Sequence, residues 1–366
     1  MDYRKKRKRK IHKHHRRLPL WLIVLICVLA VILFMAGVAY GYVQYTLGRI
    51  EKVDKAVVEK VSPENEDFET DESLPDESDG DIEYLDPESV VWDEADTTVM
   101  EDKDIVNLLL IGQDKRQGQG RQRSDAMIMV TINKKNSKIS LTSFMRDMYV
   151  QIPGYSDNRI NAAYVFGGME LLDETIEKNF GVHIDGNVEV DFQAFKKCID
   201  KLGGLDMELT EEEAEYLNRK GNWGDNNASA GTWNLQEGMN HLTGEQALAF
   251  SRIRYVGNAD YERTERQRRV LTKIFDKCKS ADAITLFNLI EELVPCVTTD
   301  LTNGELLGYA WEVLNMGVGE MENYRIPVDG GYKSAVIRQM MVLVPDLAVN
   351  RAYLEEQLYS NLSEEE

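Results

Sequence analysis

The chain has 366 residues, which is long enough to bury a core without disulfide staples, and its four cysteines form no CxxC pair of the kind that holds metals. The net charge of −20 is uneven, because the first 50 residues hold 11 of the 43 Lys and Arg but only 1 of the 63 Asp and Glu. The remainder carries 32 basic and 62 acidic side chains, which excludes a general nucleic-acid binder.

The N-terminus is a basic segment followed by an apolar one. Residues 4–17 (RKKRKRKIHKHHRR) are almost purely basic, and Leu18–Tyr42 contains no charged residue. About 25 residues at ~1.5 Å per residue cover the ~30 Å core of a bilayer, so we predict a transmembrane helix over 18–44. By the positive-inside rule the tail 1–17 is cytoplasmic, and the chain is a single-pass protein of the cell membrane with its bulk outside.

Two other interpretations of the N-terminus stay open. Gly37 and Ala39 offer a small-x-small cleavage site, although a signal peptide has an apolar region of only ~7–15 residues. The basic tail is also similar to Lys/Arg runs that bind nucleic acid, but aromatic residues that stack on bases are nearly absent there. Its position beside the apolar segment favours topogenic charge and attraction to anionic lipid, so we expect no nucleic-acid partner.

Residues 45–104 are predicted to form an acidic stalk or linker. From Glu51 to Asp104 the chain is dominated by acidic residues with Ser and Pro. This composition is too polar to bury a core, and its charges repel one another, so the segment is expected to be extended. An acidic interaction tail or a segment that collects divalent cations is the alternative.

Three strands are predicted at the start of an α/β domain over 105–360. Ile105–Gly112 is an apolar run, a second strand begins at Ala126 after a Gly-rich loop, and a third covers Lys138–Met145. If the strands alternate in direction, the end of the first, the start of the second and the end of the third meet at one sheet edge. Six charged residues would converge there: Asp114, Arg116, Arg123, Asp125, Arg146 and Asp147.

A second group of charged residues follows later in the chain. We predict a strand over Ala247–Tyr255 with two arginines on one face, and then a helix that Asp260 caps. The group consists of Arg252, Arg254, Arg263, Arg266 and Gln267. Arginines beside a helix N-terminus make an anion site, because the helix adds its own N–H donors. Pairing with acidic neighbours such as Glu262 is the purely structural alternative.

Three motifs occur in a fixed order after the apolar segment. They are G-x-D-x-R from Gly112 with R-S-D at 123–125, Arg146-Asp147 with RINAAYVFGG at 159–168, and G-x-x-x-L-x-G-x-x-A-L-x-x-x-R-x-R over 238–254. Together they resemble the LytR-CpsA-Psr family, membrane-anchored enzymes of bacterial envelopes. Ser143-Phe144-Met145 departs from the usual Ser-Ile-Pro, and Glu262 from the usual Gly, but neither departure removes an expected charged group.

The resemblance implies a fold and a function. The fold is a single extracellular α/β domain with a central mixed β-sheet flanked by helices. The function is transfer of a glycopolymer from a polyprenyl-pyrophosphate carrier at the membrane onto peptidoglycan, forming a phosphodiester, with Mg²⁺ or Mn²⁺. Asp114 and Asp125 would hold the metal, since carboxylate oxygens suit Mg²⁺. The pyrophosphate would be bound by Arg116, Arg123, Arg146, Arg252, Arg254, Arg263, Arg266 and Gln267.

Four residues are expected to act in the transfer step: Arg146, Asp147, Asp260 and Arg263. Phosphoryl transfer needs positioning and charge stabilisation more than covalent help, so a site poor in His and Cys suffices. Asp147 or Asp260 either accepts the proton of the acceptor hydroxyl or orients an arginine, and we favour the orienting role for both. Two alternatives are a receptor that binds polyprenyl phosphate without catalysis and a DNA-binding regulator.

The lipid tail requires apolar surface. Candidates on the intervening helices are Phe166, Leu171, Leu172, Ile176 and Phe195. Each of these residues is equally explained as ordinary core.

Overall fold

The computed structural model divides the chain into two units, which we describe separately. It describes residues 40–54, 58–72, 74, 82–92, 98–113, 121–219, 233–257, 259–317, 319 and 321–359. The first unit is Met1–Gly48, in which residues 40–47 are helical, and the second is Arg49–Glu366. Within the described ranges, no helix has the length and apolar character needed to cross a membrane. Most of the predicted transmembrane helix lies outside those ranges and stays a prediction.

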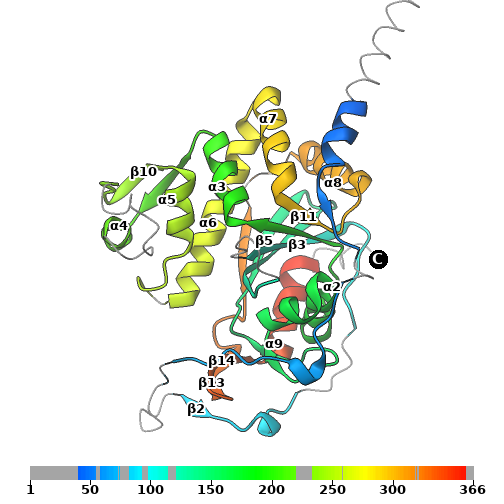
Figure 1. Ribbon diagram of the computed structural model, residues 1–366, viewed down its shortest axis with the longest axis vertical. Coiled ribbons are helices and arrows are strands. Elements are labelled where there is room, and N and C mark those ends of the chain that lie inside the picture. The colour runs from blue at the N-terminus through cyan, green and yellow to red at the C-terminus, as the bar shows by residue number, and fades with distance from the viewer. Residues whose placement is uncertain are drawn as a thin grey trace, which may run out of the picture. The chain divides into compact units, whose positions relative to one another are not determined.

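In the described part of the second unit, a mixed sheet of seven strands has the order β1-β11-β8-β3-β4-β5-β12 (Figure 1). The strands are β1 Glu51–Lys52, β3 Ile105–Gln113, β4 Ser124–Asn133, β5 Lys138–Phe144, β8 Gly186–Asp191, β11 Val297–Thr299 and β12 Glu322–Ile326. β4 is antiparallel to both β3 and β5, whereas β8 is parallel to β3 and β12 is parallel to β5. The mixed sheet and the alternating first three strands are therefore confirmed.

Smaller sheets extend this unit. β2 Glu83–Tyr84, β13 Tyr332–Ile337 and β14 Met340–Pro345 form one of them, in the order β14-β13-β2. β9 Leu205–Leu209 pairs with β10 Gly238–Leu242, and β6 Tyr149–Val150 pairs with β7 Asn158–Arg159. β6 and β7 follow directly on β5 in the chain, so they continue the sheet edge at which the charged residues were predicted to meet.

Helices pack on both faces of the central sheet (Figure 1). The α-helices in the described part of this unit are α2 Asn161–Phe180, α3 Phe192–Lys201, α4 Glu211–Asn218, α5 Gly244–Ser251, α6 Ala259–Ser280, α7 Ala283–Leu293, α8 Asn303–Met316 and α9 Leu347–Leu354, of which α4 lies beside β9 and β10 and not on the central sheet. The short helices are η2 Pro63–Asn65, η4 Pro87–Ser89, η5 Val294–Cys296 and η6 Glu355–Tyr359. The flanked sheet agrees with the predicted α/β class.

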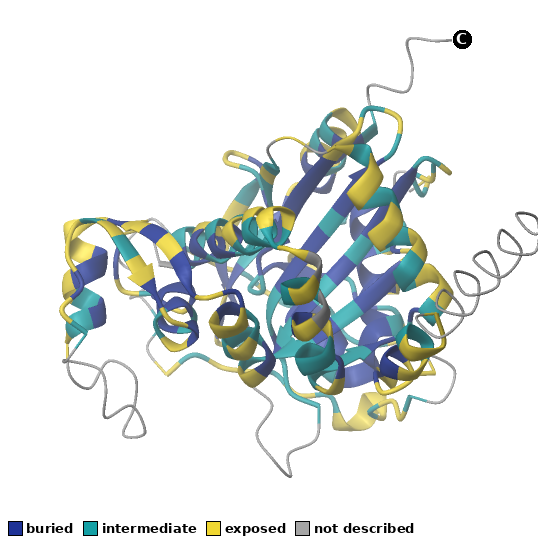
Figure 2. Cartoon of the chain, turned by 90° about the horizontal axis from the view of Figure 1, so that it is seen from above, coloured by how far each residue is buried: buried dark blue, intermediate teal, exposed yellow. Residues whose placement is uncertain are grey.

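The main core lies between the sheet and helices α2 and α9. Alternation along β3 points Leu109 and Ile111 into this core, together with Met127 and Met129 of β4, and all four are buried. Leu108, on the opposite face of β3, is only half-buried. Figure 2 shows buried and half-buried stretches along the strands of the sheet. The sheet thus has one sealed face and one that is less tightly covered.

The apolar residues considered for the lipid tail belong to packed cores. The side chains of Phe166, Leu171, Leu172 and Ile176 all lie in the cluster beneath α2. Phe195 packs against a second cluster, formed by α3, α4, α5 and α6 with β9 and β10. The core interpretation of these residues is therefore the one that the structure supports, because their surface is already used in holding the fold together.

Parts of the predicted acidic linker pack on the second unit. β1 pairs in parallel with β11 of the central sheet, and β2 pairs in parallel with β13. The Val61 amide also donates to the Phe166 carbonyl at 2.8 Å. Composition alone suggested an extended stalk, but backbone pairing is independent of side-chain polarity, and it holds these segments against the domain.

A glycine pair interrupts α2 beside the sheet edge. Gly168 adopts φ 70°, a left-handed conformation inside the helix, and a side chain there would collide with the Arg121 guanidinium. Arg121 in turn donates to the Glu59 carbonyl at 2.5 Å. Gly168 therefore lets an arginine from the segment before β4 approach the helix backbone closely.

Candidate functional site

The antiparallel strands bring charged residues together at one sheet edge. Asp125 is the second residue of β4, and Arg146 follows the end of β5. Arg146 Nη1 lies 3.0 Å from Asp125 Oδ1, and Arg146 Nε lies 3.4 Å from Asp147 Oδ2. The predicted convergence of Asp125, Arg146 and Asp147 is what the structure shows, and these residues form one wall of a charge cluster.

The opposing wall comes from the chain around the start of α6. Arg254 Nη2 lies 3.5 Å from Asp125 Oδ1, and its Nε lies 3.9 Å from Asp260 Oδ1. Arg263 Nη1 lies 2.8 Å from the same Asp260 oxygen. Arg263 is buried, and its Nε has no hydrogen-bond acceptor among the described atoms. A buried guanidinium N–H without an acceptor is costly, so the site has a donor to offer an anion.

Burial and neighbouring charges shift the pKa values of the arginines. Burial lowers the pKa of Arg146, but Asp147, Asp260 and Asp125 together raise it above its ordinary value. Burial, assisted by repulsion from Arg146 and Arg254, lowers the pKa of Arg263 to about 10 against the opposing effect of Asp260. Both guanidinium groups therefore stay charged at neutral pH.

Asp147 and Asp260 form a hydrogen-bonded carboxyl pair with opposite pKa shifts. Burial raises the pKa of Asp147, with Asp260 acting in the same direction and Arg146 against it. Burial would also raise the pKa of Asp260, but Arg263, Arg146 and Arg254 lower it below its ordinary value. The two carboxyl groups are therefore coupled, and their pKa values are shifted in opposite directions.

The pair predicts how stability depends on pH. Because the folded-state pKa of Asp147 exceeds the unfolded value of 3.8, its contribution is full below pH 3.8 and is lost as the pH rises through the folded-state pKa. The lowered pKa of Asp260 gives a contribution that is full above pH 3.8 and is lost only as the pH falls below it, so it stays constant as the pH rises from 3.8. The Asp147→Asn variant lacks the first contribution, so its free energy of unfolding relative to wild type should increase as the pH rises from 3.8. Urea unfolding at a series of pH values measures this, and a constant difference would contradict it.

The strand predicted over Ala247–Tyr255 is wrong. Thr243 and Gln246 form a capping box, which starts helix α5 and carries it to Ser251. Arg252 ends that helix, is exposed, and lies with its guanidinium 4.7 Å from the Phe192 ring centroid. Arg252 and Arg254 therefore do not share a strand face, and in the described contacts only Arg254 reaches the carboxylates of the cluster.

The helix after Arg254 is confirmed, with one change at its start. α6 begins at Ala259, so Asp260 lies in its first turn and is not its N-cap. Gln267, one turn beyond Arg263 on α6, is half-buried. Asp114 and Arg116 lie outside the described residues, so their predicted roles stay predictions.

Arg266 is placed in a separate buried network. Its Nε lies 2.7 Å from Glu213 Oε1, and its Nη2 lies 2.8 Å from Glu262 Oε2. The same guanidinium donates to the carbonyls of Ile253 and Val256. The prediction that Arg266 binds pyrophosphate is therefore corrected, because its donors already bind α4 and the loop before α6.

Arg159 completes the cluster and was not assigned to it from the sequence. It lies on β7, is buried, and its Nε is 3.5 Å from Asp147 Oδ1. On its other side, Nη2 lies 2.5 Å from Asp71 Oδ2. The signal was present, since Arg159 opens the RINAAYVFGG motif, but nothing local in the sequence indicates that a basic residue is buried there.

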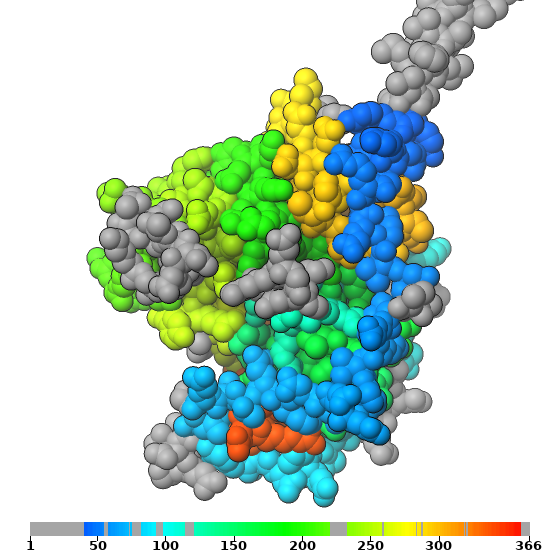
Figure 3. Space-filling view, viewed as in Figure 1, coloured from blue at the N-terminus to red at the C-terminus, as the bar shows by residue number. Residues whose placement is uncertain are grey.

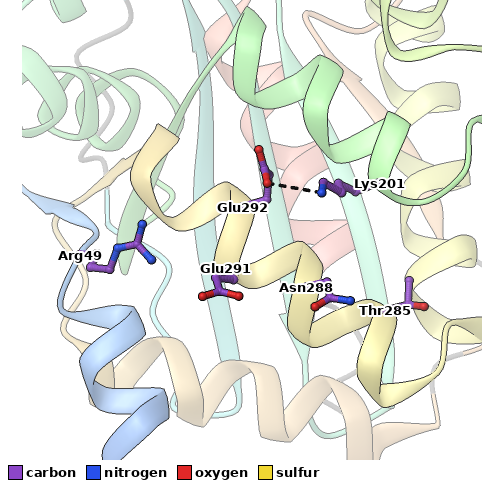
Figure 4. Close-up of a pocket in the computed structure, with 6 residues that line it drawn as sticks. All are labelled: Arg49, Lys201, Thr285, Asn288, Glu291 and Glu292. Carbon is purple, nitrogen blue, oxygen red and sulfur yellow. Dashed lines mark ion pairs between the residues drawn. The ribbon is translucent and has the colours of Figure 1, made fainter.

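A polar pocket of about 570 Å³ lies away from this cluster (Figure 4). Its lining residues are Arg49, Lys201, Thr285, Asn288, Glu291 and Glu292. Figure 4 shows Lys201 directed toward Glu292 of α7, and their charged atoms are 3.4 Å apart. Because none of the clustered arginines lines it, we do not assign the pocket to the charged chemistry.

The chemistry of Asp125 fits a divalent ion such as Mg²⁺. Its carboxylate is about one-third exposed and lies among arginines that suit phosphate oxygens. Mg²⁺ is commonly held by one or two carboxylates plus substrate phosphates and water, so a full protein cage is not required. In the described residues, no group of three or more His, Cys, Asp or Glu is arranged to hold a metal.

The mixed sheet and the arginine–aspartate cluster at its edge define an α/β domain with a concentrated charged site. The LytR_cpsA_psr family model matches residues 66–351, so the chain belongs to this family. A similar protein is the polyisoprenyl-teichoic acid–peptidoglycan teichoic acid transferase TagU of Bacillus mycoides (strain KBAB4), which is 31% identical over 239 residues. That match covers 64% of this chain and 73% of TagU.

Solved structures show the same fold. TagT bound to LI-WTA matches with a TM-score of 0.57 and 26% identity, covering 72% of this chain and 95% of TagT. TagV of B. subtilis matches with a TM-score of 0.54 and 27% identity, covering 70% of this chain and 98% of TagV. The family and the fold are thus established together.

Proposed function

We propose that this chain is a membrane-anchored phosphotransferase that moves a glycopolymer from a polyprenyl-pyrophosphate carrier onto peptidoglycan. The observation that carries the proposal is the cluster of Arg146, Arg254 and Arg263 around Asp125 and Asp260, which presents permanent positive charge at one sheet edge. The printed name of TagU, a teichoic acid transferase, supports the reaction class, and the TagT complex with LI-WTA supports the kind of substrate.

In the proposed step, a hydroxyl oxygen of the acceptor sugar attacks the sugar-side phosphorus. The bond from that phosphorus to the oxygen bridging to the second phosphorus breaks, a phosphodiester forms, and polyprenyl phosphate leaves. Arg146 and Arg254 would bind the phosphate oxygens and stabilise their charge as the bond breaks. A proton from the hydroxyl passes to the leaving phosphate or to solvent, so the reaction consumes no other reactant.

The two aspartates fit an orienting role. The lowered pKa of Asp260, caused by Arg263, Arg146 and Arg254 against the effect of burial, makes its carboxylate a weak base. Asp147 lies 3.4 Å from Arg146 and 3.5 Å from Arg159. We therefore propose that both groups hold guanidinium planes in place.

A divalent ion would be held by Asp125 together with Asp114. When bound, it would neutralise charge on the phosphate oxygens. The less tightly covered face of the sheet, with half-buried Leu108, Leu110 and Val130, supports a place for apolar substrate. Residues 1–17 and 18–44 would form the cytoplasmic tail and the anchor, which puts the domain on the outer side of the cell membrane.

The metal assignment and the transfer reaction are tested with Asp125→Ala. Full-length protein is incubated with Mg²⁺, a polyprenyl-pyrophosphate-linked saccharide and peptidoglycan oligomers, and the phosphodiester product is measured by mass spectrometry. Transfer by D125A should fall at least ~100-fold, since a charge-positioning group is lost, while the arginines still retain the lipid. Asp206→Asn is the control, because Asp206 of β9 pairs with His241 of β10 and both side chains are exposed.

Two outcomes would contradict parts of this proposal. Unchanged transfer by D125A would remove Asp125 from the metal site. Lipid binding without any product from the wild-type protein would favour the alternative function, a receptor that binds polyprenyl phosphate and does not transfer it.

A further inference from the structure

An acidic segment of the chain crosses the arginine side of the charge cluster. We call residues 66–71 (EDFETD) the acidic strap. In Figure 1 the segment after η2 runs past β14 and β13, and Figure 3 shows it on the surface beside the orange-red residues of that hairpin. Four of its six residues are Asp or Glu, so its side chains have the same sign as the substrate proposed above.

Both ends of the strap are fixed by close contacts. At one end, Glu66 accepts from the Ser156 amide at 3.0 Å and from the Ser156 hydroxyl at 2.6 Å. At the other end, Asp71 accepts from buried Arg159 at 2.5 Å and from the Met341 amide at 2.7 Å. Phe68, between the ends, packs under the Arg338 guanidinium at 4.4 Å. The course of the strap over the domain is therefore set.

The acidic side chains in the middle of the strap are held differently. Arg123 donates to the Asp67 backbone carbonyl at 3.1 Å, and its guanidinium lies 3.4 Å from the Asp67 carboxylate and 3.6 Å from that of Glu69. The Glu69 carboxylate is also 3.9 Å from Arg159, so both carboxylates are held only by longer contacts. The Asp67 side chain is 79% exposed and that of Glu69 is 48% exposed, whereas that of Arg123 is only 16% exposed. Arg123 Nη1 is buried and has no acceptor in the described residues. Arg123 thus faces loosely held carboxylates while one of its donors is unused.

Carboxylate oxygens in these positions stand in for the oxygens of a phosphate. A diphosphate can form shorter, bidentate, charge-assisted bonds with a guanidinium, which two exposed carboxylates at 3.4 and 3.6 Å do not. Arg123 stands two residues before Asp125, and the strap also contacts Arg159, which contacts Asp147. The strap therefore has a buried anchor at Arg159 of the cluster and an exchangeable pair at Arg123, two residues before Asp125.

We propose that the acidic strap is an internal competitor for the anionic substrate. Asp67 and Glu69 occupy Arg123 in the empty protein, and a diphosphate displaces them while the Asp71–Arg159 anchor stays in place. The inference rests on the proposed function, since it assigns a regulatory contact to the same site. The strap lowers the apparent affinity of the site for its substrate, because part of the binding energy of the substrate is used to displace the strap.

The test compares two double variants that each remove two negative charges, the first within the strap and the second from the residues that flank it. Asp67→Asn with Glu69→Gln removes the carboxylates that face Arg123. Glu64→Gln with Glu72→Gln removes two exposed carboxylates with no ion pair recorded in the described residues. Full-length protein in detergent micelles is titrated calorimetrically with inorganic pyrophosphate, at one ionic strength and one Mg²⁺ concentration.

We expect D67N/E69Q to bind pyrophosphate roughly 3- to 20-fold more tightly than wild type, the range for losing two exposed ion pairs. E64Q/E72Q should change affinity less than ~2-fold, because only the general field changes. Equal tightening in both variants, or none in either, would overturn the strap proposal while leaving the site intact. Absence of binding by every variant would refute the proposed function, and the strap proposal with it.

Discussion

Replacing Arg146 by Ala should lower the rate of glycopolymer transfer at least ~100-fold without unfolding the protein. Arg146 follows β5, and its guanidinium lies 3.0 Å from the Asp125 carboxylate of β4 and 3.4 Å from that of Asp147. Removing one preorganised donor that faces developing charge costs about 10²–10³ in kcat in comparable sites. Burial lowers the pKa of Arg146, but Asp147, Asp260 and Asp125 raise it above its ordinary value. The group lost in the variant is therefore a permanent cation.

Controls separate lost chemistry from lost structure. Arg146→Lys keeps the charge but not the planar fork, and should recover only part of the rate. Arg219→Ala removes an exposed arginine whose recorded ion pair is with Glu215 on α4, and should leave transfer unchanged. Product formation is measured as for D125A, with thermal unfolding in parallel. Transfer by R146A within ~3-fold of wild type would exclude Arg146 from the transfer step.

Replacing Arg266 by Met should destabilise the protein by about 3–5 kcal/mol, as expected when one partner of a buried ion pair is removed. Arg266 and Glu213 are both buried, and their charged atoms are 2.7 Å apart. Glu213 also closes the capping box of α4 with Thr210. An uncompensated Glu213 would therefore weaken α4 and its packing on α5 and α6 together.

A second substitution should reverse most of this loss. Arg266→Met combined with Glu213→Leu removes both charges, and apolar replacements of buried pairs are often neutral. Arg269→Met is the matched control, since its guanidinium is one-third exposed and lies 3.4 Å from the same Glu213, and it should cost about 1 kcal/mol or less. Urea unfolding gives these free energies. A stable R266M that has lost pyrophosphate affinity would restore Arg266 to the binding site.

Strand patterning predicted the first wall of the site. The apolar runs of β3, β4 and β5 and their alternating direction follow from hydrophobicity and short connections, and together they place Asp125 beside Arg146. Helix α6 was also predictable, because its charged residues repeat at helical spacing. These are features that depend on local sequence.

Long-range partners decided what the sequence did not show. On α6, Arg263 and Arg266 are three residues apart and could not be told apart from the sequence. Arg266 pairs with Glu213, which lies 53 residues earlier in the chain, whereas Arg263 pairs with Asp260. The strand predicted through Arg252 ignored the Thr243–Gln246 capping box, which was visible in the sequence. The contact of Arg159 with Asp71 spans 88 residues, and no single-sequence pattern reports such a pairing.

The pairing of β1 with β11 limits how far the domain can reach. Only residues 45–50 separate the proposed membrane span from β1, and six residues extend to at most roughly 20 Å. Much of the acidic segment that could have served as a long tether is instead bound to the domain surface. If 18–44 spans the bilayer as proposed, the tether between that span and the domain is therefore limited to about six residues.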